Sequence, residues 1–152
     1  MKRFISLLLS LVLVCVLSFG CLGPKVMKPE DPKTISVLLD KANKCPADEQ
    51  GWKVMYFPGK KDVEKHQVFG IVYVRGTTQG FGFVNDAGMS MLAAHDKSTG
   101  MFVIIQFGVP IPIDEPTYNE WWAEWVKIVA EDFDITKAQC GKPPIAPPSQ
   151  ES

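Results

Sequence analysis

Arginine is scarce in this chain, and basic residues do not outnumber acidic ones. The 152 residues hold 16 Lys or Arg against 17 Asp or Glu, and Arg3 and Arg75 are the only arginines. Proteins that bind nucleic acids carry clustered Lys and Arg side chains that neutralise phosphates. The composition therefore argues against a nucleic-acid partner.

Metal-binding and nucleophilic side chains are also few. His66 and His95 are the only histidines, whereas a zinc site needs three or four clustered N or S ligands, so we expect no metal and no other cofactor. Gly88 and Ser90 match the start of the Gly-x-Ser-x-Gly turn of hydrolases, but Leu92 stands where the second Gly belongs. Ser90 and His95 have opposite parity, so on one strand they face opposite sides of the sheet. We expect no enzyme, and a hydrolase ranks third among the functions considered.

Long apolar runs are limited to one, from Phe4 to Val16, directly after Lys2 and Arg3. Crossing a bilayer takes about 20 apolar residues, so this run is too short for a membrane span. A basic start, an apolar stretch and small residues at a cleavage point are the features of a secretory signal peptide. We therefore expect residues 1–20 to be removed from the mature protein.

The end of this segment resembles the signal peptides of bacterial lipoproteins, in which Gly or Ala precedes a lipid-modified cysteine. Gly20-Cys21 carries the resemblance. It implies that Cys21 is the first mature residue, acylated with fatty acids such as palmitate, and that Leu22 directs the protein to the outer membrane, facing the periplasm. Two or three acyl chains suffice for stable anchoring. The alternative is simple secretion, with Ser18-Phe19-Gly20 as the site of ordinary signal peptidase.

The cysteine count favours the lipid anchor. Loss of Cys15 with the signal peptide leaves Cys21, Cys45 and Cys140. Three free thiols in an oxidising compartment would leave one unpaired. Acylation of Cys21 removes the odd thiol, and we expect Cys45 and Cys140 to form a disulfide between the two ends of the folded domain.

Composition divides the mature chain into three parts. Residues 21–31 form the lipidated cysteine and a charged, Pro-containing tether without apolar period. Residues 32–140 have the length of a single domain. The mature chain as a whole has 14 basic and 17 acidic residues, a net charge of −3. Residues 141–152 are a Pro-rich tail that we expect to be disordered; the alternative is a polyproline ligand for a partner.

Periodicity within the domain predicts a helix, a run of strands and a second helix. Asp31 and Pro32 begin a helix that ends near Asn43, because apolar residues recur at helical spacing. The predicted strands, separated by turns that bear Gly, Asp or Asn, are 52–57, 68–75, 81–85, 89–95 and 101–107. The order predicts an α+β domain with a five-stranded, mainly antiparallel meander.

The second helix is rich in tryptophan. Thr117 and Glu120 have the spacing of a capping box, and the apolar residues that follow cover a wide arc as far as Phe133. We expect Trp121, Trp122 and Trp125 to lie in the core; the alternative is contact with a membrane interface. The segment Val109–Ile113, with alternating prolines, is expected to be an extended connection between sheet and helix, with pairing to an edge strand as the alternative.

Two of the predicted strands, 68–75 and 101–107, are apolar on both faces, so both faces of the sheet need cover. We expect one helix on each face, which leaves no site. The alternative places both helices on one face and leaves the other as an apolar groove for a lipid, a peptide or a partner protein. The candidate groove residues are Phe69, Ile71, Tyr73, Phe102 and Ile104.

Residues 85–94, with the strands on either side, resemble the meander of lipoprotein receptors of the LolB kind. Those proteins are lipid-anchored and hold acyl chains in an apolar half-barrel, but the resemblance identifies no functional residue. The sequence thus predicts a lipid-anchored envelope protein that binds or scaffolds, held to the membrane by its anchor and meeting an envelope protein partner. A carrier of lipid or acylated peptide is the alternative.

Overall fold

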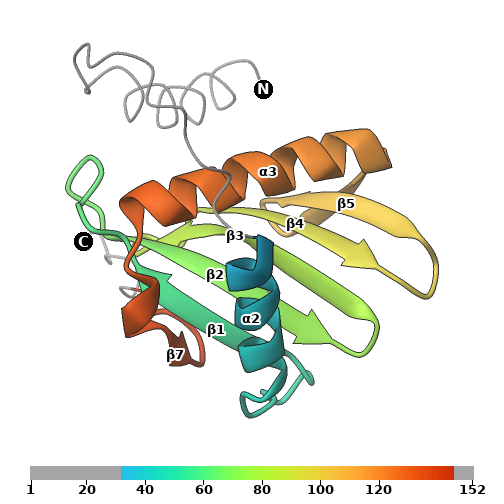
Figure 1. Ribbon diagram of the computed structural model, residues 1–152, viewed down its shortest axis with the longest axis horizontal. Helices are drawn as coiled ribbons and strands as arrows, with labels where there is room; N and C mark the ends of the chain where they lie inside the picture. Colours follow the sequence, from blue (N-terminus) through green and yellow to red (C-terminus); the bar gives the residue numbers. More distant parts are fainter. Residues whose placement is uncertain (1–31, 146–152) are drawn as a thin grey trace, which may run out of the picture.

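The computed structural model describes residues 32–145, which form an α+β domain of seven strands, two α-helices and a 3-10 turn (Figure 1). Along the chain the elements are α2 (Pro32–Asn43), β1 (Lys53–Pro58), β2 (Val68–Arg75), β3 (Thr78–Asn85), β4 (Ser90–Asp96), β5 (Met101–Gln106), β6 (Val109–Ile113), α3 (Glu115–Asp132), η1 (Ile135–Lys137) and β7 (Gln139–Cys140). The predicted signal peptide, the lipidated Cys21, the tether with Asp31, and residues 146–152 lie outside the described residues.

The sheet is antiparallel throughout, in the order β6-β5-β4-β3-β2-β1-β7. Consecutive strands from β1 to β6 are neighbours, so the predicted α+β meander is confirmed. The predicted number of five strands is wrong, because β6 and β7 extend the sheet at its two edges. β7 pairs with β1 over only two residues, too few to leave a readable pattern in the sequence.

β6 is a strand despite its prolines. Phe107 and Gly108, with φ of 51° and 76°, close a two-residue hairpin between β5 and β6. In an antiparallel ladder only every second residue bonds to a given neighbour. Pro110 and Pro112 occupy the alternate positions of an outermost strand, so the N–H groups that pairing with β5 needs are all present.

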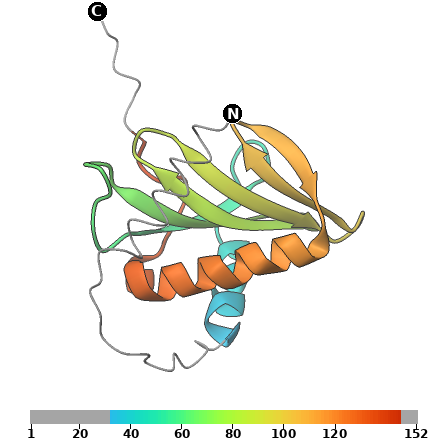
Figure 2. The same ribbon diagram turned by 90° about the horizontal axis from the view of Figure 1, so that it is seen from above.

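Both helices lie on the same face of the sheet, α2 over β1 and β2 and α3 beside it towards β5 (Figure 2). One buried cluster joins Leu38 of α2 and Trp125 of α3 to Met55, Val72 and Phe81 of the strands. The expectation of one helix on each face is therefore wrong. α2 contacts β1 and β2, and α3 contacts β5, so the two helices share one face by covering different strands.

Trp125 is the central side chain of this core. It is 3% exposed, and its Nε1 donates a 2.9 Å hydrogen bond to the carbonyl oxygen of Gly82 in β3. Its ring packs against Phe81, with centroids 5.3 Å apart. The prediction of a core position is confirmed for Trp125, whereas Trp121 and Trp122 are partly buried at the margin of the core.

The start of α3 differs from the prediction. The helix begins at Glu115 with Asp114 as its N-cap, and Asp114 Oδ1 accepts a 2.8 Å hydrogen bond from the backbone N–H of Thr117. The predicted cap at Thr117 lies inside the first turn. Asp is among the best capping residues, and Pro116 fits the first turn, where a missing N–H costs nothing.

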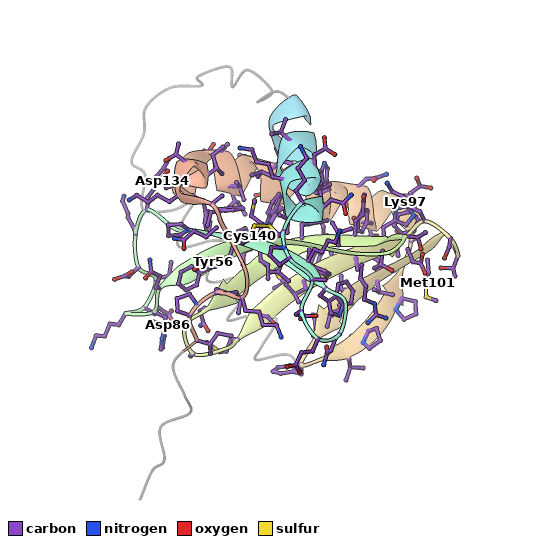
Figure 3. The ribbon with its side chains drawn as sticks, turned by 90° about the horizontal axis from the view of Figure 1, so that it is seen from below. Tyr56, Asp86, Lys97, Met101, Asp134 and Cys140 are labelled. Carbon is purple, nitrogen blue, oxygen red and sulfur yellow. A yellow bond between two sulfur atoms is a disulfide. The ribbon has the colours of Figure 1, made fainter. Side chains whose placement is uncertain are left out.

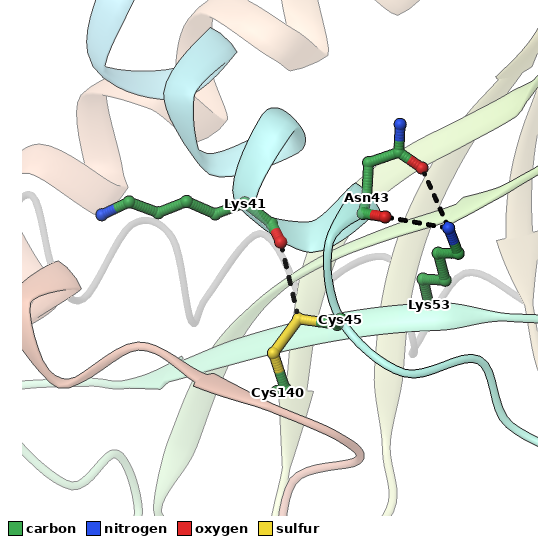
Figure 4. The surroundings of a disulfide bond; sticks show 5 residues. All are labelled: Lys41, Asn43, Cys45, Lys53 and Cys140. Carbon is green, nitrogen blue, oxygen red and sulfur yellow. Dashed lines mark hydrogen bonds between the residues drawn. A yellow bond between two sulfur atoms is a disulfide. The ribbon is translucent and has the colours of Figure 1, made fainter.

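The predicted disulfide joins Cys45, just after α2, to Cys140 in β7, with a Cα–Cα distance of 5.4 Å (Figure 4). Beside it, Lys53 Nζ of β1 donates a 2.9 Å hydrogen bond to the carbonyl oxygen of Asn43 at the end of α2. The two contacts fix the first helix to one edge of the sheet. The disulfide closes a loop across 95 positions, nearly the whole domain.

We predict that Cys140→Ala lowers the free energy of unfolding, by at most about 4–5 kcal/mol, because a loop of this length strongly restricts the unfolded chain. Urea denaturation measures the effect. The double variant Cys45→Ala with Cys140→Ala is the control, and its loss should match that of the single variant. Labelling of both thiols in denatured, unreduced wild-type protein would contradict the pairing.

Candidate functional site

One face of the sheet carries no helix from residues 32–145, the part of the chain that the structure describes, and we call it the helix-free face. Cross-strand neighbours in an antiparallel sheet share a face, and the strand register defines this one through rows such as Val54–Tyr73–Gly80–Ala94–Val103. Its apolar side chains include Val54, Tyr56, Phe69, Ile71, Tyr73, Val84, Leu92, Ala94, Val103 and Ile105. In Figure 3 both helices lie on one side of the sheet and Tyr56 is labelled on the other.

Part of this face is covered by its own side chains. The ring of Tyr73 occupies the space above Gly80, where an added Cβ would clash with it. The Tyr73 hydroxyl donates a 2.9 Å hydrogen bond to the carbonyl oxygen of Ala93, and burial raises its pKa above the ordinary value of about 10. Trp52 packs edge-on against Tyr73, and the Arg75 guanidinium lies 4.7 Å from the centre of the Trp52 ring. These contacts keep Tyr73 only 6% exposed without a helix above it.

The start of the C-terminal tail is attached to the domain. The backbone N–H of Gly141 donates a 2.9 Å hydrogen bond to the carbonyl oxygen of Val54. Lys142 forms an ion pair with Asp48 at 3.3 Å, and Pro143 is buried. Ile145 reaches the turn between β3 and β4, since a Cβ added at Gly88 would lie 3.4 Å from it. Residues 141–145, which the sequence assigns to a disordered tail, therefore contact the domain through a backbone hydrogen bond, an ion pair and the buried Pro143, whereas Ile145 stays 48% exposed.

The structure separates the predicted groove residues into two groups. Phe69, Ile71 and Tyr73 of β2 lie together on the helix-free face, as the alternative arrangement requires. Phe102 and Ile104 of β5 lie on the helix-covered face. The sequence shows that β5 alternates but not which of its two sets shares a face with Phe69; the residues of β5 on that face are Val103 and Ile105.

Several partly exposed members of the helix-free face are aliphatic, and Tyr56 is partly exposed as well. Ile71, Leu92, Val103 and Ile105 are intermediate in exposure, whereas Phe69 and Tyr73 are buried. Ile71, Leu92 and Ile105 lie in one row across the sheet, with Gly82 between the first two. The side chain of Leu92 leans over Gly82, 2.9 Å from the position that a Cβ would take. The row is thus a continuous apolar surface without a deep hollow at its glycine.

A small cavity lies on the opposite face, at the start of α3. It has a volume of about 230 Å³ and is walled by four rings, those of His95, Phe102, Tyr118 and Trp122. Gln79, Glu115 and Asn119 complete its lining. The sequence analysis does not identify this cavity, because its walls come from three strands and a helix that only the tertiary structure brings together.

The structure also places the polar residues that the sequence offers as candidates, Ser90 with His95 and His66. Ser90 faces the helix-free side and His95 the helix-covered side, so the strand register keeps them apart. His66 Nδ1 lies 2.7 Å from Asp86 Oδ1 at the ends of β2 and β3. The pKa of Asp86 is lowered, first by the backbone N–H of Gln67 and then by His66. This pair closes a loop between neighbouring strands.

Comparison of the chain with protein-family models, with curated proteins and with solved structures found no match. Within residues 32–145, no group of three or more His, Cys, Asp or Glu side chains is placed to hold a metal ion. In the same described part, neither helix has the length and apolar character to cross a membrane.

Tyr118, in the cavity wall, gives a testable pH dependence. Burial raises its pKa to about 12, against an ordinary value of about 10. Between these values the folded state keeps the phenol proton while the unfolded state loses it, so stability must fall as pH rises. We predict that Tyr118→Phe removes up to about 2 kcal/mol of this loss by pH 12.

Urea denaturation from pH 9 to pH 12 measures the effect. Tyr56→Phe, which removes a partly exposed phenol, is the matched control and should follow the wild-type curve. Parallel curves for Tyr118→Phe and wild type would refute the assignment of the alkaline loss to Tyr118.

Proposed function

We propose that this chain is a lipid-anchored protein of the cell envelope that acts by binding or scaffolding and has no enzymatic activity. In this proposal Cys21 carries the lipid, and the domain faces the periplasm from the outer membrane. The disulfide between Cys45 and Cys140 supports an oxidising compartment. The anchor itself rests on the resemblance of the first residues to lipoprotein signal peptides.

The observation that carries the binding function is the apolar, helix-free face. An antiparallel sheet with one uncovered face normally alternates apolar and polar side chains, so that the uncovered face is polar. Here that face holds Ile71, Leu92, Val103 and Ile105, all partly exposed. A contiguous apolar surface of this kind marks a site of interaction with another molecule.

The shape of the face favours a partner protein over an enclosed ligand. Tyr73 fills the space above Gly80, and Leu92 leans over Gly82, so the two glycines do not open a pocket. An apolar layer without a pocket at its glycines suits a protein partner, because the core contacts of protein interfaces are apolar. The carrier of lipid or acylated peptide remains the second candidate, because the exposed side chains are aliphatic and match acyl chains chemically.

The anchor is tested by Cys21→Ser, which removes the thiol that lipidation needs. We predict that the wild-type mature chain fractionates with membranes and carries added acyl mass at Cys21. The variant should be found as uncleaved precursor or as soluble protein. A soluble wild-type chain without added mass would refute the anchor and favour simple secretion.

The binding face is tested by Ile105→Lys, which places a charge among partly exposed aliphatic side chains of β5. We predict that the wild-type protein, isolated from native membranes after mild cross-linking, retains a defined envelope protein that the variant loses. The measurement is mass spectrometry of the proteins and lipids that co-purify. Val37→Lys, at a 45% exposed position on α2, is the matched control and should retain the partner.

Thermal denaturation of each variant separates a lost contact from a lost fold. A phospholipid retained by wild type and lost by Ile105→Lys would decide for the carrier. Identical sets of proteins and lipids on wild type, Ile105→Lys and Val37→Lys would exclude the helix-free face as the binding surface.

A further inference from the structure

The cavity at the start of α3 has a different character from the helix-free face. Tyr118 and Trp122 are four positions apart on α3, so both project from the same side of the helix. They meet the cross-strand neighbours His95 of β4 and Phe102 of β5. The result is a hollow of about 230 Å³ with aromatic walls on both its helix side and its sheet side.

The rings of this cavity are held in place by contacts with one another and with the core. His95 and Phe102 stack, with centroids 4.1 Å apart and planes 13° apart. Phe102 also packs against Tyr118 at 5.0 Å. Trp122 lies edge-on to the buried Phe81 at 4.9 Å. Such a wall is formed before a ligand arrives, which lowers the entropy cost of binding.

The lining has one acidic side chain, Glu115, and neither lysine nor arginine; His95 is its one imidazole. Glu115 is exposed, and within the described part of the chain its carboxylate has neither a hydrogen bond nor an ion pair. Gln79 and Asn119, the other polar side chains, are neutral amides. The nearby carboxylate of Asp114 occupies the N-cap and offsets the partial positive charge of the helix start. The cavity is therefore suited to a cation.

We propose that this cavity binds an organic ammonium group, such as the quaternary ammonium of a choline-type compound. Aromatic side chains attract a cation through the negative potential of their π-systems, and they also accept the methyl groups of a quaternary ammonium. Glu115 supplies the formal negative charge at the edge. An anion would meet that carboxylate, and a neutral apolar molecule of the same shape would gain only the contact area. The site is separate from the helix-free face, and its function does not depend on the anchor.

The first test compares choline with 3,3-dimethyl-1-butanol, which has the same shape without the charge. The full mature chain in non-ionic detergent is titrated, and the indole N–H signal of Trp122 is followed by NMR. We expect saturable binding of choline with a dissociation constant on the order of 1 mM. The neutral analogue should bind at least about fivefold more weakly. Equal binding of the two compounds, or no saturation with choline, would overturn the proposal.

Variants of two glutamates on α3 test the charge. Glu115→Gln should weaken choline binding about threefold or more, because it removes the carboxylate and leaves the rings in place. Glu120→Gln, on the same helix but outside the cavity lining, is the matched control and should bind as wild type does. Equal weakening by the two variants would show a general charge effect and would count against the site.

The aromatic walls are tested separately. Trp122→Leu should weaken choline binding about fivefold or more, whereas Trp121→Leu, on the same helix but outside the cavity lining, should bind as wild type does. In the Trp122 variant, binding is followed through the amide signal of Asn119. Unchanged thermal midpoints establish that both variants are folded. Full affinity in a folded Trp122→Leu variant would overturn the aromatic site.

The source of the ammonium group is distinguished by two further probes. Free phosphocholine represents a soluble compound, and vesicles of phosphatidylcholine represent a lipid headgroup; binding of either supports the site. Vesicles of phosphatidylglycerol, whose headgroup lacks the cation, should leave the Trp122 signal unchanged. A similar shift with phosphatidylglycerol would mean that the cavity recognises a lipid surface without regard to the ammonium group.

Discussion

The seven-stranded sheet carries apolar side chains on both of its faces. The two helices of the described chain cover only one of these faces. The other face must be kept from water by other means, because exposed apolar area costs about 25 cal/mol for each Å². Tyr73 lies over Gly80, Trp52 packs against Tyr73 with Arg75 over the Trp52 ring, and residues 141–145 pass from β1 to the turn before β4. These contacts do not cover the row of Ile71, Leu92 and Ile105, which stays partly exposed. The proposed binding function depends on this row.

Much of the secondary structure could be predicted from the sequence, because hydrophobic periodicity and turn residues are local. The first helix has the predicted bounds of Pro32 and Asn43, and five strands are close to their predicted positions. The two edge strands are not predicted by local sequence patterns. The prolines of β6 are unusual in a strand, and β7 has only two residues. The sequence predicts Thr117 as the N-cap of α3, whereas Asp114, three residues earlier, is the N-cap in the structure. Both residue types can cap a helix, so the local sequence does not decide between them.

The candidate sites were less predictable, because they depend on relations between distant elements. The alternation of β5 is visible in the sequence, but only the register shows that Val103, and not Phe102, shares a face with Tyr73. The face that each helix covers depends on contacts between α2 or α3 and distant strands, which no local pattern in the sequence encodes. The aromatic cavity requires α3 to cross β5 at Phe102, and no pattern within either segment encodes that contact.

The prolines of β6 also bear on how copies of this chain can meet. Pro110 and Pro112 take the outward positions of the outermost strand, so this margin of the sheet offers carbonyl oxygens but no N–H donors. At the other margin, β7 is too short to act as a template for a further strand. Strand-by-strand polymerisation is therefore blocked at both ends, even at the high surface density that a membrane anchor would impose. Molecules that carry an apolar face can thus be crowded together without growing into fibrils.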